Sequence, residues 1–400
     1  MAVLGIVAFV VALMVSVVLH EAGHFVTARR FGMKATQFFA GFGPTVWSFR
    51  RGETEYGLKA IPAGGFVKIV GMTPLEDIDP EDEPRAFYRQ SAPKKAVVLA
   101  AGSFVHFCIA LLLVFGVTTL LPSVDQDAPV VSAPAATVPV SATAAGVSDE
   151  TVPAPAAGVL QDGDRVLAVG GTPVQTWREV VELVRESPGE PLAFELERGG
   201  STTTVTLTPA EVTRPDLDDP SQSVQVGAIG VGQDIVLDRL GPGEALTESV
   251  DRLELMVTGT YRAVTEKLGT ITTLYTPERD REGLVGLVGA ARVSGEVLDL
   301  EQVPFVLRVA DFLLLIAGLN LFVGLFNLLP LLPLDGGHLA VLAYENARDR
   351  VKRLFGYRGE FQRVDFTKLL PLTYVVVVAF AGLTLWIMGA DIVNPIRLTE

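Results

Sequence analysis

His20-Glu21-Ala22-Gly23-His24 ends the first apolar segment of this 400-residue chain and decides how the rest of it is interpreted. The residues before it, Ala2 to Leu19, carry no charge. In a helix, side chains four residues apart share one face, so both imidazoles can reach one metal ion while Glu21 sits beside them. Ionisable groups are costly at the edge of a membrane-spanning segment and are usually functional there. The pattern therefore predicts that His20 and His24 bind a metal and that Glu21 takes a proton from water.

Four apolar runs account for the high hydrophobic content of 49 % and the mean hydropathy of +0.40. They lie at 2–24, 96–121, 305–334 and 369–390. Each is close to the length of about 20 residues that a membrane-spanning helix needs. The first run lacks a basic start and a small-residue cleavage site, so we do not expect a cleaved signal peptide. The predicted fold class is a polytopic α-helical membrane protein with four transmembrane helices.

The net charge of −14 is unevenly distributed along the chain. Residues 122–304 carry 12 Lys and Arg against 29 Asp and Glu, whereas the remainder carries 20 against 17. An acidic central domain is well solvated, and nothing in it suggests nucleic-acid binding. Residues 25–95 hold 11 basic side chains and residues 341–368 hold seven. The positive-inside rule predicts that both segments are cytoplasmic, which places both termini and residues 122–304 outside.

The segment after the metal motif alternates in a way that favours strands. Two runs, Thr45–Arg50 and Glu55–Ile61, flank a glycine-containing turn, and a further arm is expected at Gly64–Val70. Because the segment follows the metal helix directly, this β-hairpin at 35–70 either re-enters the membrane or lies in the cytoplasm as an ordinary hairpin. Non-helical backbone at membrane depth is tolerated only where it is buried in protein or lines a wet cavity.

The central part of the chain begins with residues 122–157, which have the composition of a linker or of irregular edge strands. A compact unit follows, with strands expected at Arg165–Val169, Leu192–Leu196 and Thr202–Leu207 and a helix at Thr176–Glu186. This order resembles a bacterial PDZ domain, which adds a peptide to an exposed strand edge. The alternative is a small α/β spacer without a ligand.

The residues that lead to the third run contain one clear pattern. Apolar positions at helical spacing between 244 and 269 predict an amphipathic helix that lies on the membrane or on the domain. The glycine-punctuated residues 283–300 show no pattern that assigns a conformation.

The third run carries Asn327-Leu-Leu-Pro330-Leu-Leu-Pro333-Leu-Asp335-Gly-Gly-His338. Two prolines and a glycine pair break the helix, so Asp335 is expected on irregular backbone. Because this run also crosses from outside to inside, Asp335 reaches the same depth as His20 and His24. Two imidazoles, a carboxylate and one open position make the ligand set of a catalytic zinc site. In the alternative interpretation, Asp335 is an ordinary turn residue.

Two other histidines need separate interpretations. His106, in the second run, is expected to pack through a hydrogen bond between helices, with metal ligation as the alternative. His338 is expected to support the site or to pack beside it, because three protein ligands leave the position that catalysis needs open.

These motifs, in this order, resemble the bacterial site-2 proteases, and most closely their single-PDZ actinobacterial members. The resemblance covers nearly the whole chain. It implies zinc as the cofactor, Glu21 as the base, a membrane-re-entrant hairpin, and a substrate held as an extended strand near Asn327 and Pro330. The chain departs from the family in the second run, where relatives carry Gly-Pro-x-x-Asn and this sequence has Gly102-Ser103-Phe104-Val105-His106.

The resulting prediction is a zinc metalloendopeptidase that cleaves the transmembrane segments of single-span proteins. It would lie in the bilayer of a bacterial plasma membrane, with its active site near the cytoplasmic face. The resemblance suggests anti-sigma factors, in regulated intramembrane proteolysis, or signal-peptide remnants as substrates. The alternative is an inert membrane scaffold that presents partners through the PDZ-like domain, although a structural metal site needs no base and is usually closed by a fourth ligand. A metal transporter is disfavoured, because transporters show repeated halves and binding sites near the bilayer midplane.

The predicted organisation follows the order of these segments. It comprises 1–24, first span with the metal motif; 25–95, hairpin region; 96–121, second span; 122–230, linker and PDZ-like extracytoplasmic domain; 231–304, amphipathic helix and membrane-proximal region; 305–340, third span with the Asp335 motif; 341–368, cytoplasmic loop; 369–390, fourth span; and 391–400, outer tail.

Overall fold

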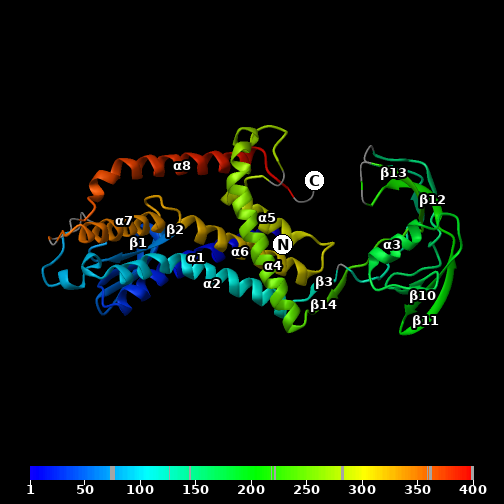
Figure 1. Ribbon diagram of the computed structural model, residues 1–400, viewed down its shortest axis with the longest axis horizontal. Helices are drawn as coiled ribbons and strands as arrows, with labels where there is room; N and C mark the ends of the chain where they lie inside the picture. Colours follow the sequence, from blue (N-terminus) through cyan, green and yellow to red (C-terminus); the bar gives the residue numbers. More distant parts are fainter. Residues whose placement is uncertain are drawn as a thin grey trace. The chain divides into compact units, whose positions relative to one another are not determined.

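The computed structural model describes residues 1–72, 77–125, 127–143, 146–217, 219, 222–280, 283–357, 359 and 363–397. Contacts between Cα atoms divide the chain into two compact units, Met1–Leu121 with Leu240–Glu400, and Pro122–Arg239 (Figure 1). The first unit is mostly helical, and the second consists mainly of strands. The second unit extends beyond residue 230 because β14 (Val236–Asp238) pairs with β3 (Ser123–Asp125).

Within the described residues, four helices are long and apolar enough to cross a membrane, and they match the four predicted apolar runs. They are α1 (Ala2–Arg30), α2 (Ala92–Leu120), α6 (Phe305–Asn327) and α8 (Leu370–Val393), with the 3-10 turn η4 (Phe366–Leu369) before α8. Contacts join α1 to α2 and α2 to α6. Large apolar side chains such as Val3, Leu112 and Val378 stay exposed, as expected of helices that face lipid.

α1 and α2 are each longer than the predicted run. α1 continues past His24 to Arg30, because no proline or glycine follows before Gly32 and Ala28 is fully buried. Two 3-10 turns, η1 (Glu83–Arg85) and η2 (Phe87–Arg89), lead to α2. α2 begins at Ala92 with a proline in its first turn, a position where the missing N–H leaves no intrahelical bond unmade.

The expectation that Asp335 lies on irregular backbone is wrong. The helix does break, since α6 ends at Asn327 and the chain turns through 328–334, but Asp335 then begins α7 (Asp335–Leu354). An acidic side chain is favoured in a first turn, where backbone N–H groups are unpaired. The two glycines that follow let the preceding loop pack against the helix. A Cβ at Gly337 would lie 2.6 Å from the carbonyl carbon of Leu331.

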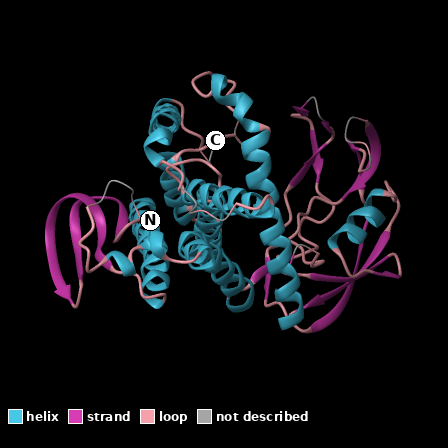
Figure 2. Ribbon diagram, turned by 60° about the vertical axis from the view of Figure 1, so that its left-hand side comes forward, coloured by secondary structure: helices cyan, strands magenta, loops and turns pink. Residues whose placement is uncertain are grey.

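β1 (Ala35–Arg51) and β2 (Thr54–Ile69) form an antiparallel two-stranded sheet (Figure 2). β2 folds back on itself, so that residues 37–40 pair with 55–58 and also with 65–68. The 65–69 segment packs against α1, because a Cβ at Gly65 would lie 3.2 Å from Cγ of Glu21. The sheet is therefore attached to the helix that carries the metal motif.

α4 (Pro242–Thr265) corresponds to the amphipathic helix predicted at 244–269 and is followed by the 3-10 turn η3 (Lys267–Thr273). Its buried Ser249 hydroxyl lies 2.7 Å from that of Thr118 on α2. Leu255 and Tyr261 on its other face are exposed, so α4 presents an apolar surface that no described residue covers.

Residues 283–300, for which the sequence predicted no conformation, contain α5 (Leu287–Asp299). A side chain of α8 caps the start of this helix. The Asp391 carboxylate accepts hydrogen bonds from the backbone N–H groups of Gly286 and Gly289, each 2.9 Å long. It also accepts one of 2.8 Å from Arg279, and both charged side chains are almost fully buried. The Asp391 carboxylate thus joins the C-terminal end of α8 both to the start of α5 and to Arg279.

The second unit is built from short strands around one helix. They are β3, β4 (Thr137–Pro139), β5 (Ala142–Thr143), β6 (Gly146–Val147), β7 (Thr151–Pro153), β8 (Arg165–Val169), β9 (Thr172–Pro173), β10 (Leu192–Arg198), β11 (Ser201–Leu207), β12 (Ala210–Pro215), β13 (Ser223–Ala228) and β14, with α3 at Trp177–Arg185. The largest sheet has the order β11-β10-β8-β9. α3 begins with a capping box formed by Thr176 and Glu179, and its Val180 packs on Phe194 and Leu196 in the main core.

Candidate metal centre

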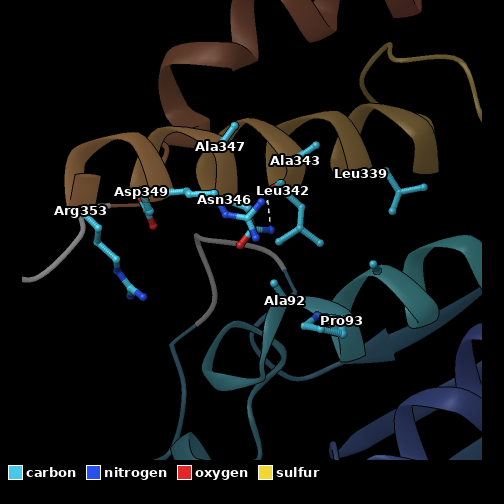
Figure 3. Close-up of a pocket in the computed structure, with 11 residues that line it drawn as sticks. Ala92, Pro93, Leu339, Leu342, Ala343, Asn346, Ala347, Asp349 and Arg353 are labelled. Atoms are coloured by element: carbon cyan, nitrogen blue, oxygen red, sulfur yellow. Dashed lines mark hydrogen bonds between the residues drawn. The ribbon is translucent and has the colours of Figure 1, made fainter. Parts of the chain in front are cut away.

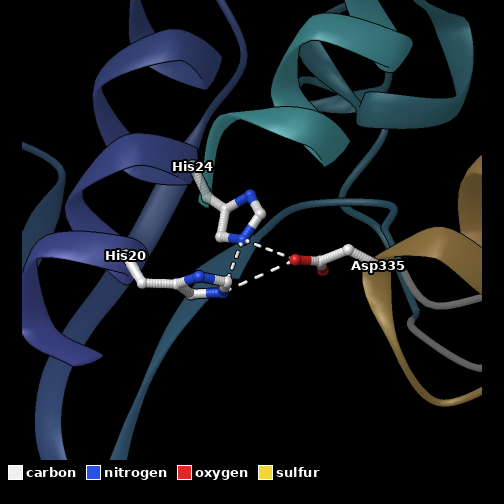
Figure 4. A group of neighbouring side chains, drawn as sticks. All are labelled: His20, His24 and Asp335. Carbon is white, nitrogen blue, oxygen red and sulfur yellow. Dashed lines mark hydrogen bonds and ion pairs between the residues drawn. The ribbon is translucent and has the colours of Figure 1, made fainter. Parts of the chain in front are cut away.

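α1 and α7 bring the three predicted ligands, His20, His24 and Asp335, to one place (Figure 4). The Nε2 atoms of the two histidines are 3.1 Å apart. Oδ2 of Asp335 lies 3.5 Å from Nε2 of His20 and 3.3 Å from Nε2 of His24. Both histidines are buried, and the Asp335 side chain is 17 % exposed, so the group lies largely within the protein.

The donor atoms fit a zinc ion by chemistry and by spacing. Zinc bonds to imidazole nitrogen and carboxylate oxygen are about 2.0–2.1 Å long, which at tetrahedral angles places ligand atoms about 3.3 Å apart. The three observed separations, 3.1, 3.3 and 3.5 Å, lie close to that value. The buried Oδ2 atom of Asp335 has no hydrogen-bond partner among the described residues. Three lone pairs thus converge on one point with a carboxylate oxygen left unsatisfied, as a metal site requires.

α2 forms the wall behind the two histidines. Nδ1 of His24 donates a hydrogen bond of 2.7 Å to the carbonyl oxygen of Val98, which leaves Nε2 to face the centre. A Cβ at Gly102 would lie 2.5 Å from Nε2 of His24 and 2.6 Å from Nδ1 of His20. The sequence interpretation gave Gly102 and Val98 no role, although the glycine inside an apolar run was a signal for close helix approach.

Glu21 lies on the side of the centre that faces β2. A Cβ on Gly65 of β2 would lie 3.2 Å from Cγ of Glu21, and the carboxylate is close enough to His24 and Asp335 for their charges to interact. The hairpin edge and the metal helix therefore meet at Glu21.

The remaining predicted residues are not among the converging ligand atoms. Asn327 is the last residue of α6 and is partly buried, whereas Pro330 is exposed in the loop before α7. His106 is not among the converging ligand atoms: its Nδ1 lies 2.8 Å from Oδ1 of Asn320, and its ring centroid is 5.0 Å from that of His20. His338 stacks on Phe366 with ring centroids 5.6 Å apart.

A family model described as peptidase family M50 matches residues 8–358. The chain belongs to this family. The resemblance to the site-2 proteases, drawn from the motifs alone, is thereby confirmed.

This M50 chain is similar over its whole length to zinc metalloprotease Rip1 of Mycobacterium tuberculosis (strain Erdman), with 39 % identity and full coverage of both chains. It is also similar to zinc metalloprotease RasP of Geobacillus kaustophilus, with 28 % identity over 93 % of this chain and 96 % of that protein. A solved PDZ domain of an SdrC-like protein from Listeria monocytogenes matches 24 % of this chain and 83 % of its own, at 17 % identity and a TM-score of 0.15.

Proposed function

We propose that this protein cleaves the transmembrane segments of single-span proteins, using His20, His24 and Asp335 to hold zinc and Glu21 as the base. The enzyme class is that of its family: a zinc metallopeptidase of the site-2 protease type. The observation that carries the proposal is the convergence of two imidazoles and one carboxylate beside Glu21, with both imidazoles on α1, a helix apolar enough to cross a membrane. Three protein ligands leave one coordination position open, as a catalytic site requires.

The proposed chemistry divides between the metal and the side chains. When bound, zinc polarises the scissile carbonyl and makes water nucleophilic near neutral pH. Glu21 takes the proton of the attacking water and then delivers it to the leaving amine. Val98 holds the His24 ring in the orientation that presents Nε2 to the ion. Packing against Gly65 of β2 keeps the Glu21 side chain on the hairpin side of the centre.

A helical substrate must unwind first, because its carbonyl groups are otherwise hydrogen-bonded within the helix. The 65–69 segment of β2 pairs on one side with β1, and its other side adjoins α1 at Glu21. An unwound substrate would add to this edge as a further strand, with main-chain hydrogen bonds replacing those of its helix. Asn327 and Pro330, at the end of α6 and in the next loop, would hold the same extended chain.

The proposed setting is a bacterial plasma membrane crossed four times. The basic segments 25–95 and 341–368 would be cytoplasmic, the PDZ-like unit and both termini outside, and the metal centre near the inner face. The hairpin would re-enter the membrane beside α1. Membrane-anchored anti-sigma factors and signal-peptide remnants are the proposed substrates, on family resemblance.

The test of the proposal is co-expression of wild type and Glu21→Gln with single-span candidate substrates. The glutamine keeps the size of the side chain and removes its basicity, so zinc content should stay at one ion per chain while cleavage falls by roughly 10²–10⁴-fold. Glu301→Gln, which removes an exposed carboxylate before α6, is the matched control and should cleave normally. Full cleavage by Glu21→Gln would remove the assigned role. Zinc without cleavage by wild type would instead favour a scaffold.

The second unit is proposed to exclude substrates whose outer part has not been trimmed. Residues 125 and 236 are paired in β3 and β14, so residues 126–235 can be replaced by a short turn without separating the flanking chain. The shortened protein should cleave an untrimmed substrate that wild type leaves intact. Equal behaviour of the two proteins would contradict the filter.

A further inference from the structure

The second half of β1, residues 42–51, is exposed along its whole length. This segment, the arm, pairs along one edge with residues 54–61 of β2, and no described residue pairs with its outer edge. The sheet stands at the side of the helical unit (Figure 2). Large apolar side chains of the arm are left uncovered there, since Val46, Trp47 and Phe49 are 69 %, 57 % and 46 % exposed.

One face of the arm carries a row of aromatic rings that reaches α1. Alternate residues of a strand point to the same side of a sheet, so Trp47, Phe49 and Arg51 share this face. The ring centroids of Trp47 and Phe49 are 5.1 Å apart, and Phe49 stacks on Tyr56 of β2 at 5.4 Å. The Tyr56 ring in turn meets that of Phe25, on α1, at 5.7 Å. These four rings and Arg51 form the aromatic face of the arm.

The aromatic face is bordered by positive charge. Arg29 of α1 donates a hydrogen bond of 3.4 Å to the hydroxyl group of Tyr56. Neither Arg29 nor Arg51 forms an ion pair with a described residue. Glu53, two residues beyond Arg51, is already held by Arg85 through hydrogen bonds of 2.6 and 2.8 Å. Both guanidinium charges therefore remain available to an anionic ligand.

The turn end of the arm lies level with the end of α1. Arg85, which holds Glu53 in the turn, also donates a hydrogen bond of 3.2 Å to the carbonyl oxygen of Gly32, two residues beyond α1. α1 is long and apolar enough to cross a membrane, so its basic end should lie among the headgroups. Arg51, which directly precedes the turn, is then at headgroup level too.

The other end of the arm lies deeper. A Cβ at Gly64 would lie 2.7 Å from the ring of Phe42, and one at the next residue, Gly65, would lie 3.2 Å from Cγ of Glu21. At 1.5 Å per residue, Glu21 is about 13 Å inside the end of α1. The arm therefore runs from the apolar part of α1 to its basic end, and its own side chains change from apolar to basic in the same direction.

Residues 348–353 of α7 form another basic cluster, but its charges are offset. Asp349 and Arg353 both line a cleft of about 910 Å³ against the first turn of α2, and Figure 3 shows them toward the same end of α7. Arg353 also has a partner. The aromatic face of the arm is therefore the basic surface whose charge is better placed to bind an anion.

We propose that the aromatic face binds an anionic phospholipid of the inner leaflet, with the phosphate at Arg29 and Arg51 and an acyl chain along Phe49 and Trp47. Guanidinium groups bind phosphate oxygens through charge-assisted hydrogen bonds. Indole rings favour the boundary between headgroups and acyl chains. Headgroup oxygens would also supply acceptors for the outer edge near Ser48, because unpaired strand edges are not tolerated in hydrocarbon. The inference rests on the proposed membrane setting of the hairpin and does not depend on cleavage.

The experiment uses Trp47 as the reporter in the full-length protein, reconstituted in phosphatidylcholine bilayers. Trp177→Phe and Trp386→Phe together leave Trp47 as the only tryptophan of the chain. Lipids with brominated acyl chains quench the fluorescence of a ring that they touch. Brominated phosphatidylglycerol and brominated phosphatidylcholine, compared at equal content, therefore report which lipid lies against Trp47. Phosphatidylglycerol should be preferred by roughly five-fold to 25-fold, because each basic contact near a membrane surface contributes about five-fold.

The variants separate the aromatic face from general charge. Arg51→Gln should lower the preference about five-fold. Arg50→Gln is the matched control: it removes the same charge from the adjacent residue, whose side chain points to the opposite face of the sheet, and it should stay within two-fold of the parent protein. Trp386, on α8, is 49 % exposed and gives a second control. In the protein with Trp47→Phe and Trp177→Phe, it should show no preference between the two lipids.

The possible failures are distinguishable. Quenching of Trp47 by neither lipid would overturn the proposal together with the membrane setting of the hairpin. Equal quenching by both lipids would overturn the lipid site alone and leave that setting intact. Equal effects of Arg51→Gln and Arg50→Gln would also overturn the site, because the charge would then act without the aromatic face.

Discussion

Replacing Gly102 by alanine should remove zinc from the protein while leaving it folded. A Cβ on this residue would lie 2.5 Å from Nε2 of His24 and 2.6 Å from Nδ1 of His20, and close to Cε1 of His20 as well. Ordinary contacts of that kind need about 3.5 Å, so the rings must retreat by roughly 1 Å. Side-chain rings can rotate away without moving the backbone, and the fold should therefore persist.

The expected loss follows from the geometry of the ligands. A displacement of about 1 Å in a catalytic group costs around 10²-fold in rate, and a metal site tolerates deviations of only about 0.2 Å in its bond lengths. Zinc content should fall well below one ion per chain, and cleavage of a co-expressed substrate should drop at least 10²-fold. Zinc is measured by mass spectrometry of the purified protein, and cleavage by the appearance of fragments cut within the span.

The matched control is Gly116→Ala in the same helix. A Cβ at Gly116 would meet nothing within 4 Å, so the substitution should leave zinc and cleavage unchanged. Its thermal stability should rise slightly, because alanine is about 1 kcal/mol better than glycine in a helix interior. One zinc ion per chain and a wild-type cleavage rate in Gly102→Ala would refute the argument that α2 contacts the ligands.

Three further outcomes are expected. Prolonged treatment with a zinc chelator should abolish cleavage, and added zinc should restore it, whereas magnesium should not, because nitrogen ligands disfavour magnesium. Arg279→Met should lower the free energy of unfolding of the helical unit by about 3–5 kcal/mol, because Asp391 is left buried and charged. The measurement is denaturant-dependent proteolysis. An unchanged free energy of unfolding would mean that the ion pair does not contribute to stability. Burial alone would raise the pKa of Asp164, but the two hydrogen bonds from Arg198 hold it below its usual value. Asp164→Asn should therefore destabilise the second unit by about 2 kcal/mol at pH 7. That difference should shrink as pH falls below about 4, through the lowered pKa of the folded state, since protonation removes the same interaction from wild type. A difference that stays constant with pH would contradict this assignment.

The features that the sequence alone predicts well are those with a local physical cause. The i, i+4 spacing of His20 and His24 determines their shared face whatever surrounds them. The apolar runs and the alternation at 35–70 locate the long helices and the hairpin by period. The prediction that Asp335 approaches the histidines needed a further argument. The basic residues that follow the first and the third apolar run indicate that both runs cross the membrane in the same direction, and neither run shows this by itself.

Other features depend on contacts that no local pattern encodes. α5 escaped prediction because Gly289 and Gly295 weaken its helical signal, yet Gly295 lets α5 meet α1 so closely that a Cβ would lie 2.7 Å from the carbonyl oxygen of Ala2. The strands between 123 and 153 have two or three residues each, too few to show a period. The steric requirement for glycine at position 102 arises from the contact of α2 with His20 and His24 of α1, which the sequence alone does not reveal.

The departure at His106 can be understood from the same packing. Asn320 donates its amide to the carbonyl oxygen of Ile316, which turns its own Oδ1 toward His106. An amide oxygen can only accept, so Nδ1 of His106 carries a hydrogen and donates it to Asn320. A neutral partner such as Asn320 suits a buried ring 5.0 Å from His20, a proposed zinc ligand, because a positive charge on that ring would oppose the metal. Asn320→Asp would supply a carboxylate that favours the charged ring, and it should therefore weaken zinc binding, whereas Asn320→Gln should do so only through packing. Equal zinc affinity for Asn320→Asp and wild type would show that the charge of this ring does not reach the centre.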